Sequence, residues 1–202
     1  MNKRFVGILA MLLIIFALPA FGQKIVTDGT DQGTKLGAHY EAGGIFFNYP
    51  EDWIYWENAS FNRIRDMMKS QPGLDLLVML KTKDDACTLQ VGKIKNPSSF
   101  DSFYKSEKKF ADQIAAEGID FSGMHYGNYS LNVVELPINQ KAILVYAERQ
   151  DGQVGVSYKL LSGGYEYTVN FIYNNKTTAT EERNQNIREG LMNSLKITGI
   201  LS

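Results

Sequence analysis

Residue types that usually perform catalysis or bind metals are scarce in this sequence. Of its 202 residues, one is cysteine and two are histidine. A lone cysteine excludes an internal disulfide, so Cys87 would stay a free thiol or bridge to another molecule. His39 and His125 have no second ligand at the spacing of a zinc site. A glycine-rich phosphate loop is also absent. The sequence therefore predicts no metal site and no cofactor.

A concentrated charge of one sign is missing as well. The chain has 21 basic and 22 acidic residues, a formal net charge of −1. Its densest basic run, "KSEKK" at 105–109, is interrupted by Glu107. Nucleic-acid binding needs a concentrated basic patch, so nucleic acid is excluded as an expected partner. Within a helical stretch this run predicts a solvated outer face.

An extended apolar run without charge stands at the start of the chain. Lys3 and Arg4 precede the uncharged residues 5–18, and residues 20–22 read Ala-Phe-Gly. The run is short for a transmembrane helix, which needs about 20 apolar residues. This order of parts is typical of an export signal. We predict a signal peptide over residues 1–22 and a mature chain that starts at Gln23. The alternative is an uncleaved anchor. A lipid anchor of the bacterial lipoprotein kind is not expected, because no cysteine stands near the cleavage point.

The exported chain is long enough for one domain with its own core. Removal of residues 1–22, which hold two basic residues and no acid, leaves 180 residues with a formal charge of −3. Residues 23–43 contain four glycines and no apolar period. We therefore predict a flexible leader over 23–43 and a single domain over 44–202.

Alternating apolar and polar residues predict an antiparallel meander over residues 141–174. Strands at 141–149, 154–160 and 165–173 are joined by Asp151-Gly152 and by Ser162-Gly163-Gly164, which are hairpin signals. In the second strand Lys159 is expected on the face away from the apolar residues, and in the third Glu166 and Asn170 are. Further strands are predicted at 74–81, 87–94 and 127–136, and "GIFFNY" at 44–49 is expected to start the sheet.

Two longer helices and one short helix are predicted. The first follows Pro97, with Ser98 or Ser99 as its N-cap and Gly118 as its stop. The second begins at Thr178, which forms a capping-box pattern with Glu181. A shorter helix is expected over residues 60–69. Helices that interrupt or follow an antiparallel sheet cover its faces, so the fold class is α+β, a layered α/β/α sandwich with a mainly antiparallel sheet.

The order of these parts resembles the PsbP/Mog1-like superfamily. The resemblance rests on "F-x-Y-P-x-x-W" (Phe47 to Trp53), on the helix "SFDSFYKSEKKFADQIAAEG", on the meander, and on the closing helix that runs into "LMNSLKI". It spans roughly residues 44–198, and the short helix at 60–69 departs from the family pattern. The resemblance implies an antiparallel sheet flanked by helices and a non-catalytic role. The export signal fits the bacterial envelope members, which places the protein in the periplasm or outside the cell.

The aromatic stretch "GIFFNYPEDWIY" at 44–55 has two possible interpretations, a structural corner or a binding platform. Pro50 cannot donate to a strand ladder, so it is expected to end the strand, with Trp53 folding back as part of the core. Trp56 stands beside Glu57 and Asn58. It is the predicted exposed contact and the candidate binding residue.

The function favoured by these residues is that of an exported, non-catalytic accessory protein. It would bind a protein or a small apolar ligand through one sheet face or beside Trp56. The alternative is a thiol-dependent hydrolase-type enzyme that uses Cys87 and His125. Cys87 alternates with Leu89 and Val91 on a strand, which favours a buried and inert thiol. The partner or ligand, the biological process and the oligomeric state stay open at this point.

Overall fold

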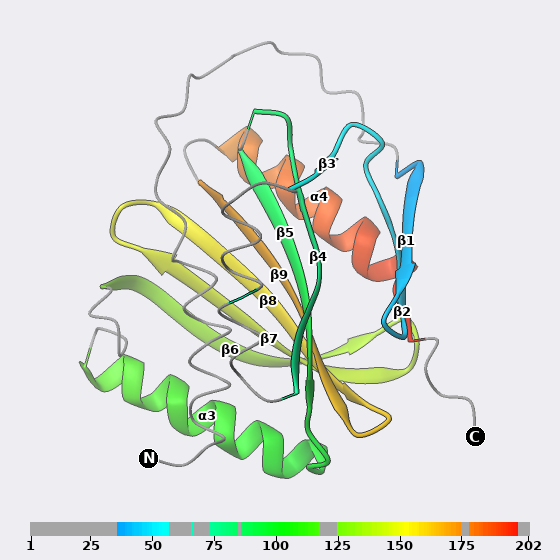
Figure 1. Cartoon of the computed structure of the whole chain (residues 1–202). Helices are drawn as coiled ribbons and strands as arrows, with labels where there is room; N and C mark the ends of the chain where they lie inside the picture. The colour runs from blue at the N-terminus through cyan, green and yellow to red at the C-terminus, as the bar shows by residue number, and fades with distance from the viewer. Residues whose placement is uncertain are drawn as a thin grey trace.

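The computed structural model describes residues 36–56, 66, 73–84, 86–117, 125–174 and 178–197. In chain order the elements are β1 (Ala38–Ala42), β2 (Ile45–Tyr49), β3 (Ile54–Tyr55), β4 (Leu74–Lys81), β5 (Cys87–Lys95), α3 (Phe100–Glu117), β6 (Tyr126–Leu136), β7 (Gln140–Arg149), β8 (Gln153–Ser162), β9 (Tyr165–Asn174), α4 (Thr178–Ser194) and β10 (Lys196–Ile197). Figure 1 shows their arrangement. The predicted signal peptide lies outside the described residues. So does the predicted short helix at 60–69, apart from Asp66, which is helical.

The main sheet has seven strands in the order β3-β4-β5-β9-β8-β7-β6, and each pairs antiparallel with its neighbours. The predicted meander is confirmed as β7, β8 and β9, joined by tight turns. Gly163 and Gly164 both have positive φ, 57° and 78°, which is the backbone that a two-residue hairpin of matching twist requires. The strands predicted at 74–81, 87–94 and 127–136 are β4, β5 and β6.

A second, three-stranded sheet has the order β1-β2-β10. The expectation that residues 44–49 start the main sheet is wrong, because β2 is the centre of this smaller sheet. The predicted extent of the leader is also wrong at its C-terminal end. Residues 38–42 form β1 and pair with the whole of β2, from Ala38↔Tyr49 to Ala42↔Ile45. Two glycines of positive φ, Gly43 and Gly44, close that hairpin. β1 is an edge strand and mostly exposed, so its sequence has no apolar period. The strand could therefore not be recognised from the sequence pattern.

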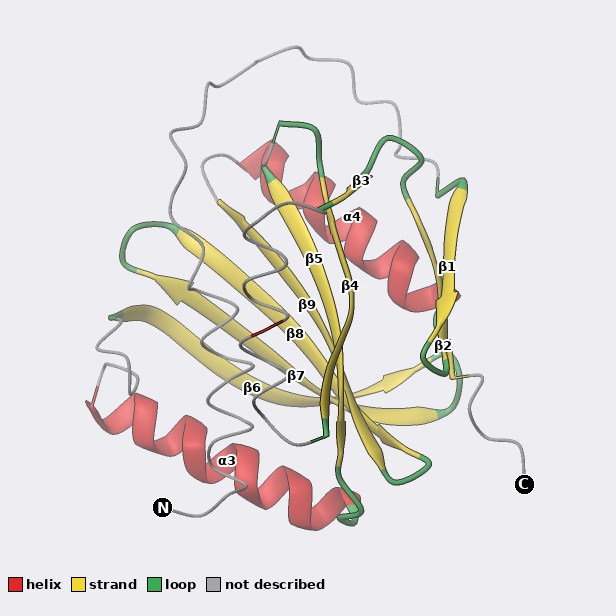
Figure 2. Cartoon of the chain, in the orientation of Figure 1, coloured by secondary structure: helices red, strands yellow, loops and turns green. Residues whose placement is uncertain are grey.

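The two helices cover opposite faces of the main sheet, which confirms the α+β class and its layers (Figure 2). Helix α3 packs over β6 and β7 through Phe103, Phe110 and Ile114. The predicted cap is present, because the Ser99 hydroxyl accepts the backbone N–H of Ser102 at 3.3 Å. Helix α4 packs on the other face, where the small sheet joins it. The backbone N–H of Asn48 in β2 donates to the Ser194 hydroxyl at 2.8 Å.

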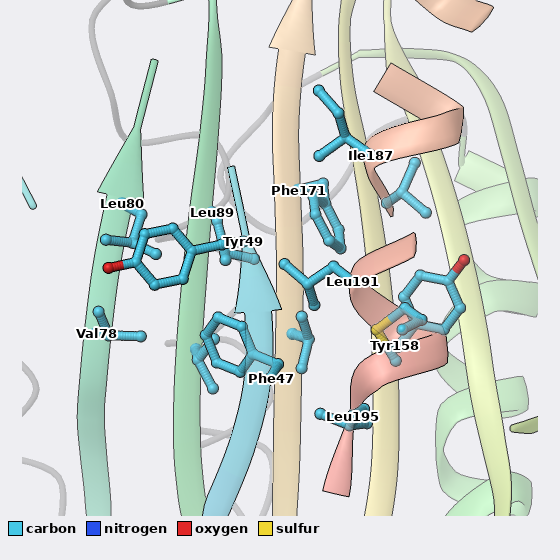
Figure 3. Packing of buried hydrophobic residues seen from close by; sticks show 14 of the residues in the cluster. Phe47, Tyr49, Val78, Leu80, Leu89, Tyr158, Phe171, Ile187, Leu191 and Leu195 are labelled. Atoms are coloured by element: carbon cyan, nitrogen blue, oxygen red, sulfur yellow. The ribbon is translucent and has the colours of Figure 1, made fainter. Parts of the chain in front are cut away.

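The larger core lies between the main sheet, α4 and the small sheet, as Figure 3 shows. Side chains from β2, β4, β5, β8, β9 and α4 meet there, among them Phe47, Leu80, Leu89, Phe171, Leu191 and Leu195, each at most 1% exposed. Because β2 and α4 both contribute to this core, the small sheet is an integral part of the domain.

Candidate functional site

The corner between the two sheets is the stretch that the sequence left ambiguous. Strand β2 ends at Tyr49, and the carbonyl of Pro50 accepts the backbone N–H of Trp53 at 3.1 Å, which closes a tight turn. The chain then enters β3, where Ile54 pairs with Lys81 and Tyr55 with Leu80 on β4. Pro50 therefore ends one sheet and directs the chain to the edge of the other.

The two tryptophans of this corner are both buried. Trp53 is 4% exposed and belongs to the larger core, which confirms its predicted role. Trp56 is 7% exposed, so its predicted exposure is wrong. Its backbone N–H donates to the carbonyl of Met79 at 2.9 Å, and the Lys81 ammonium lies 5.4 Å from its ring centroid. The polar residues that follow Trp56 suggested a surface position, but the pairing with β4 draws its ring inward.

The exposed apolar residues of the corner are the two that sequence reasoning missed. Ile54 is 40% exposed and Tyr55 is 48% exposed. Successive side chains of a strand point to opposite faces, so Ile54 and Tyr55 lie on either side of β3, the last described strand at this edge of the main sheet. The Tyr55 ring stands edge-on to Tyr49, with centroids 6.5 Å apart and an interplanar angle of 81°. The sequence signal for this pair was the hydrophobic stretch "WIYW" at 53–56. The stretch alone does not tell which of its four residues are buried and which are exposed.

Charged residues stand near this apolar pair, in the preceding turn and on the neighbouring strand. Glu51 and Asp52 are exposed in the turn, and Lys81 stands opposite Ile54. An apolar centre with a polar rim is the usual composition of a protein-binding surface. We call Glu51, Asp52, Ile54, Tyr55 and Lys81 the corner patch.

The predicted thiol pair of the alternative function does not form. Cys87 lies on β5 and is 3% exposed, and burial raises the pKa of its thiol to about 12. His125 lies next to β6 and is exposed. Strands β9, β8 and β7 stand between β5 and β6 in the sheet, so the two side chains are four strand spacings apart. At about 4.8 Å a spacing, this separation prevents an imidazole from activating the thiol.

A buried ion pair joins α3 to the main sheet. The Lys159 ammonium on β8 lies 2.6 Å from Oε2 of Glu107, and both side chains are at most 2% exposed. Burial lowers the pKa of Lys159, but Glu107 and Glu166 outweigh that effect, so its pKa is raised and the ammonium stays charged. The predicted solvated face at 105–109 is therefore wrong at Glu107. Its spacing carried the signal, because it follows Phe103 by four residues and precedes Phe110 by three, on the same helix stripe.

Further polar side chains are buried on this same face of the sheet. Glu166 accepts from Asn96 Nδ2 at 3.0 Å and from the Thr168 hydroxyl at 3.4 Å. Gln90 and Asn170 stand directly opposite each other on β5 and β9 and are 1% and 3% exposed. The expected orientation of Glu166 and Asn170 away from the apolar face is correct, but α3 covers part of that second face and solvent does not reach them. We call Glu107, Lys159 and Glu166 the buried charge cluster.

The buried charge cluster has a structural rather than a catalytic composition. Both Glu107 and Lys159 are engaged with each other, and neither is reached by solvent. A second polar group lies under α4, where the Tyr173 hydroxyl donates to Glu181 at 3.0 Å and accepts from Arg188 at 3.2 Å. Burial raises the pKa of Tyr173, so its phenol stays protonated at neutral pH. In the described part of the chain, no group of three or more His, Cys, Asp or Glu residues is placed to hold a metal ion.

Neither helix of the described ranges combines the length and apolarity of a membrane span. The predicted anchor alternative concerns residues 5–18, which lie outside these ranges.

Solved structures are similar to this chain at low sequence identity. The chain is similar to the solution structure of cyanobacterial PsbP from Synechocystis, with 13% identity and a TM-score of 0.49 over 84% of this chain and 98% of that one. A crystal structure from Bacteroides thetaiotaomicron is similar over 81% of this chain and 49% of its own, with 13% identity and a TM-score of 0.38. No protein-family model matches the sequence, and no curated protein does. The α+β class of this chain rests on its own described strands and helices.

Proposed function

We propose that this protein is an exported, non-catalytic accessory domain that binds a partner protein through the corner patch. The observation that carries the proposal is the exposure of Ile54 and Tyr55, 40% and 48%, on a strand at the edge of the main sheet. Exposed aromatic side chains beside an apolar neighbour often anchor protein interfaces. The carboxylates of Glu51 and Asp52 would favour a partner whose apolar pocket is bordered by basic groups.

The non-catalytic part of the proposal follows from the polar side chains that are present. Cys87 is buried and protonated, and the buried charge cluster is closed to solvent. A nucleophile with an adjacent base in reach of substrate is the minimum for a hydrolase of the kind considered above. Within the described ranges, the side chains around Cys87 and in the buried charge cluster do not meet that requirement.

The test is partner capture from envelope extract with a surface variant and a matched control. The bait variant Ile54→Ser/Tyr55→Ser removes the apolar centre and leaves the backbone pairing of β3 unchanged. The control is Tyr165→Ser, which removes another exposed aromatic side chain, 36% exposed, at the β8–β9 turn. A protein retained by the wild type and by the control, but lost with the double variant, supports the proposal. An identical set of retained proteins for all three baits would contradict it.

Export is tested separately by the mass of the protein recovered from the periplasm or medium of a bacterial host. We expect a chain that begins at Gln23. A full-length chain in the inner membrane would indicate the anchor instead.

A further inference from the structure

The edge of the main sheet opposite the corner patch is the long strand β6, whose outer side no strand of the described ranges borders. Strand β6 has eleven residues, about twice the usual strand length, and pairs with β7 on its inner side. In the described part of the chain no strand pairs with the outer side of residues 128–136, because β6 is the last strand of the sheet. The backbone N–H and C=O groups on the outer side of an edge strand are the groups with which another strand pairs.

Strand β6 lacks the features with which proteins usually block such an edge. It contains no proline, lysine or arginine, and its one charged residue is Glu135 near its end. The irregularity in its pairing lies between Tyr126 and Asn128, at its start, so the rest of the strand is regular. A long, regular edge strand with little charge is a template for pairing with another chain.

The side chains of β6 are complementary to a second copy of the same strand. Tyr129 and Leu131 share the face that packs under α3, and Val133 on that face is 46% exposed. Asn128 and Asn132 share the other face and are exposed. A partner strand that continues both faces needs the same alternation of apolar and polar residues, and residues 129–133 of β6 have it.

We propose that two copies of this chain pair through β6 in an antiparallel, two-fold arrangement centred on Leu131, which joins the two main sheets. In this register Leu131 faces its own copy, Tyr129 faces Val133, and Ser130 faces Asn132. Directly opposite residues of antiparallel strands lie on the same face, so over residues 129–133 the apolar and polar rows both continue across the axis, and next to them Asn128 faces Val134. Glu135 faces Gly127, so no like charges meet, and an exported chain with a formal charge of −3 has only modest long-range repulsion against its copy.

The partner in this proposal is a second copy and the surface is β6, so it is independent of the corner patch. Its first test is sedimentation of the chain purified after export from a bacterial host. The wild type is expected to sediment with twice the mass of one chain. The variant Asn132→Lys/Val133→Lys places four lysines beside the two-fold axis of a pair and should sediment as a single chain. The matched control is Glu41→Lys/Ala42→Lys, which changes two exposed residues of β1, the edge strand of the small sheet. It should keep the doubled mass.

The register is tested by disulfide formation. Because Cys87 is buried, the cysteine introduced by Leu131→Cys is the reactive one, and at the axis it faces its own copy within the distance that a disulfide spans. Oxidation should convert the wild-type background carrying Leu131→Cys to a covalent dimer, and Glu41→Cys should form no covalent dimer. A wild type that sediments as one chain up to its highest soluble concentration overturns the proposal. A doubled mass that the β6 lysines leave intact, in variants whose thermal unfolding matches the wild type, overturns it as well.

Discussion

Lys159 and Glu107 stand 52 positions apart in the chain, yet their side chains meet at 2.6 Å between α3 and β8, out of reach of solvent. Taking two charges out of water is costly, and the attraction between them roughly compensates for it when they are well paired. Such a pair therefore adds little net stability, but either partner alone is strongly unfavourable.

We expect Glu107→Ala to lower the free energy of unfolding by about 3–5 kcal/mol, because it leaves the Lys159 ammonium buried without a counter-charge. The double variant Glu107→Leu/Lys159→Met should recover most of that loss. Urea unfolding of Glu107→Ala and of the double variant measures the loss and its recovery. A surface comparison is Asp112→Asn, which breaks the exposed Lys108–Asp112 pair and should leave the midpoint unchanged. If Glu107→Ala behaved like the surface variant, the pair would not be buried in solution.

Glu166 is predicted to make stability depend on pH. Burial raises the pKa of Glu166, with a further rise from Glu107, and the opposing effects of Lys159, Asn96 and Thr168 are smaller. A carboxyl whose pKa is higher in the folded state favours folding when protonated. That contribution is complete below the unfolded-state value of about 4.3 and is lost as the pH rises through the raised folded-state value.

The variant Glu166→Gln cannot ionise and keeps an oxygen acceptor for Asn96. Relative to the wild type, the variant should therefore become more stable as the pH rises from about 4 to about 8, because only the wild type loses stability when Glu166 ionises. Denaturant unfolding at several pH values measures the difference. The exposed Glu135→Gln serves as the control and should follow the wild type throughout. A constant difference for Glu166→Gln would show that burial does not perturb this carboxyl.

Substitutions in the corner should separate the buried tryptophans from the exposed tyrosine. Trp53→Ala and Trp56→Ala each leave a large cavity and should cost about 3–5 kcal/mol of unfolding free energy. Tyr55→Ala removes a half-exposed side chain and should cost far less, because it leaves no closed cavity. Denaturant melts of the three variants compare them directly. A small loss for Trp56→Ala would place its ring at the surface, as its sequence neighbours first suggested.

The thiol of Cys87 should be unreactive while the protein is folded. Burial raises its pKa to about 12, so the thiolate is nearly absent at neutral pH, and solvent does not reach the sulfur. Iodoacetamide at pH 8 should label the unfolded chain in urea and leave the folded chain unlabelled, as seen by mass spectrometry. Fast labelling of the folded chain would show an accessible, reactive thiol and would support the alternative function, a thiol-dependent hydrolase.

Strand β1 should contribute to stability. The Tyr40 ring lies 5.3 Å from that of Phe47, and its hydroxyl donates to the carbonyl of Leu77 at 3.2 Å. A chain that begins at Gly44 loses these contacts and one side of the β2 ladder, so it should unfold at a lower temperature than a chain that begins at Leu36. Calorimetry compares the two. Equal thermal unfolding midpoints for the two chains would show that residues 38–42 do not stabilise the domain and belong to the leader.

Local patterns in the sequence determined most elements of this fold. The meander, helices α3 and α4, and the burial of Trp53 could be predicted, because alternation, helical spacing and caps act within a few residues of one another. The candidate site was only partly predictable. The sequence located the stretch "WIYW" but selected Trp56 as exposed, where the structure exposes Ile54 and Tyr55.

Only the tertiary structure decided what covers the face of each strand that is turned away from the larger core. Lys159 and Glu166 alternate with apolar residues as an exposed row would, yet both are buried, and the Lys159 ammonium meets Glu107 of α3, 52 positions earlier in the chain. Strand β1 gains its order from pairing with β2, and the ring of Trp56 is drawn inward by β4. A periodic pattern shows which residues share a face. Whether solvent or another element lies against that face depends on contacts between segments far apart in the chain.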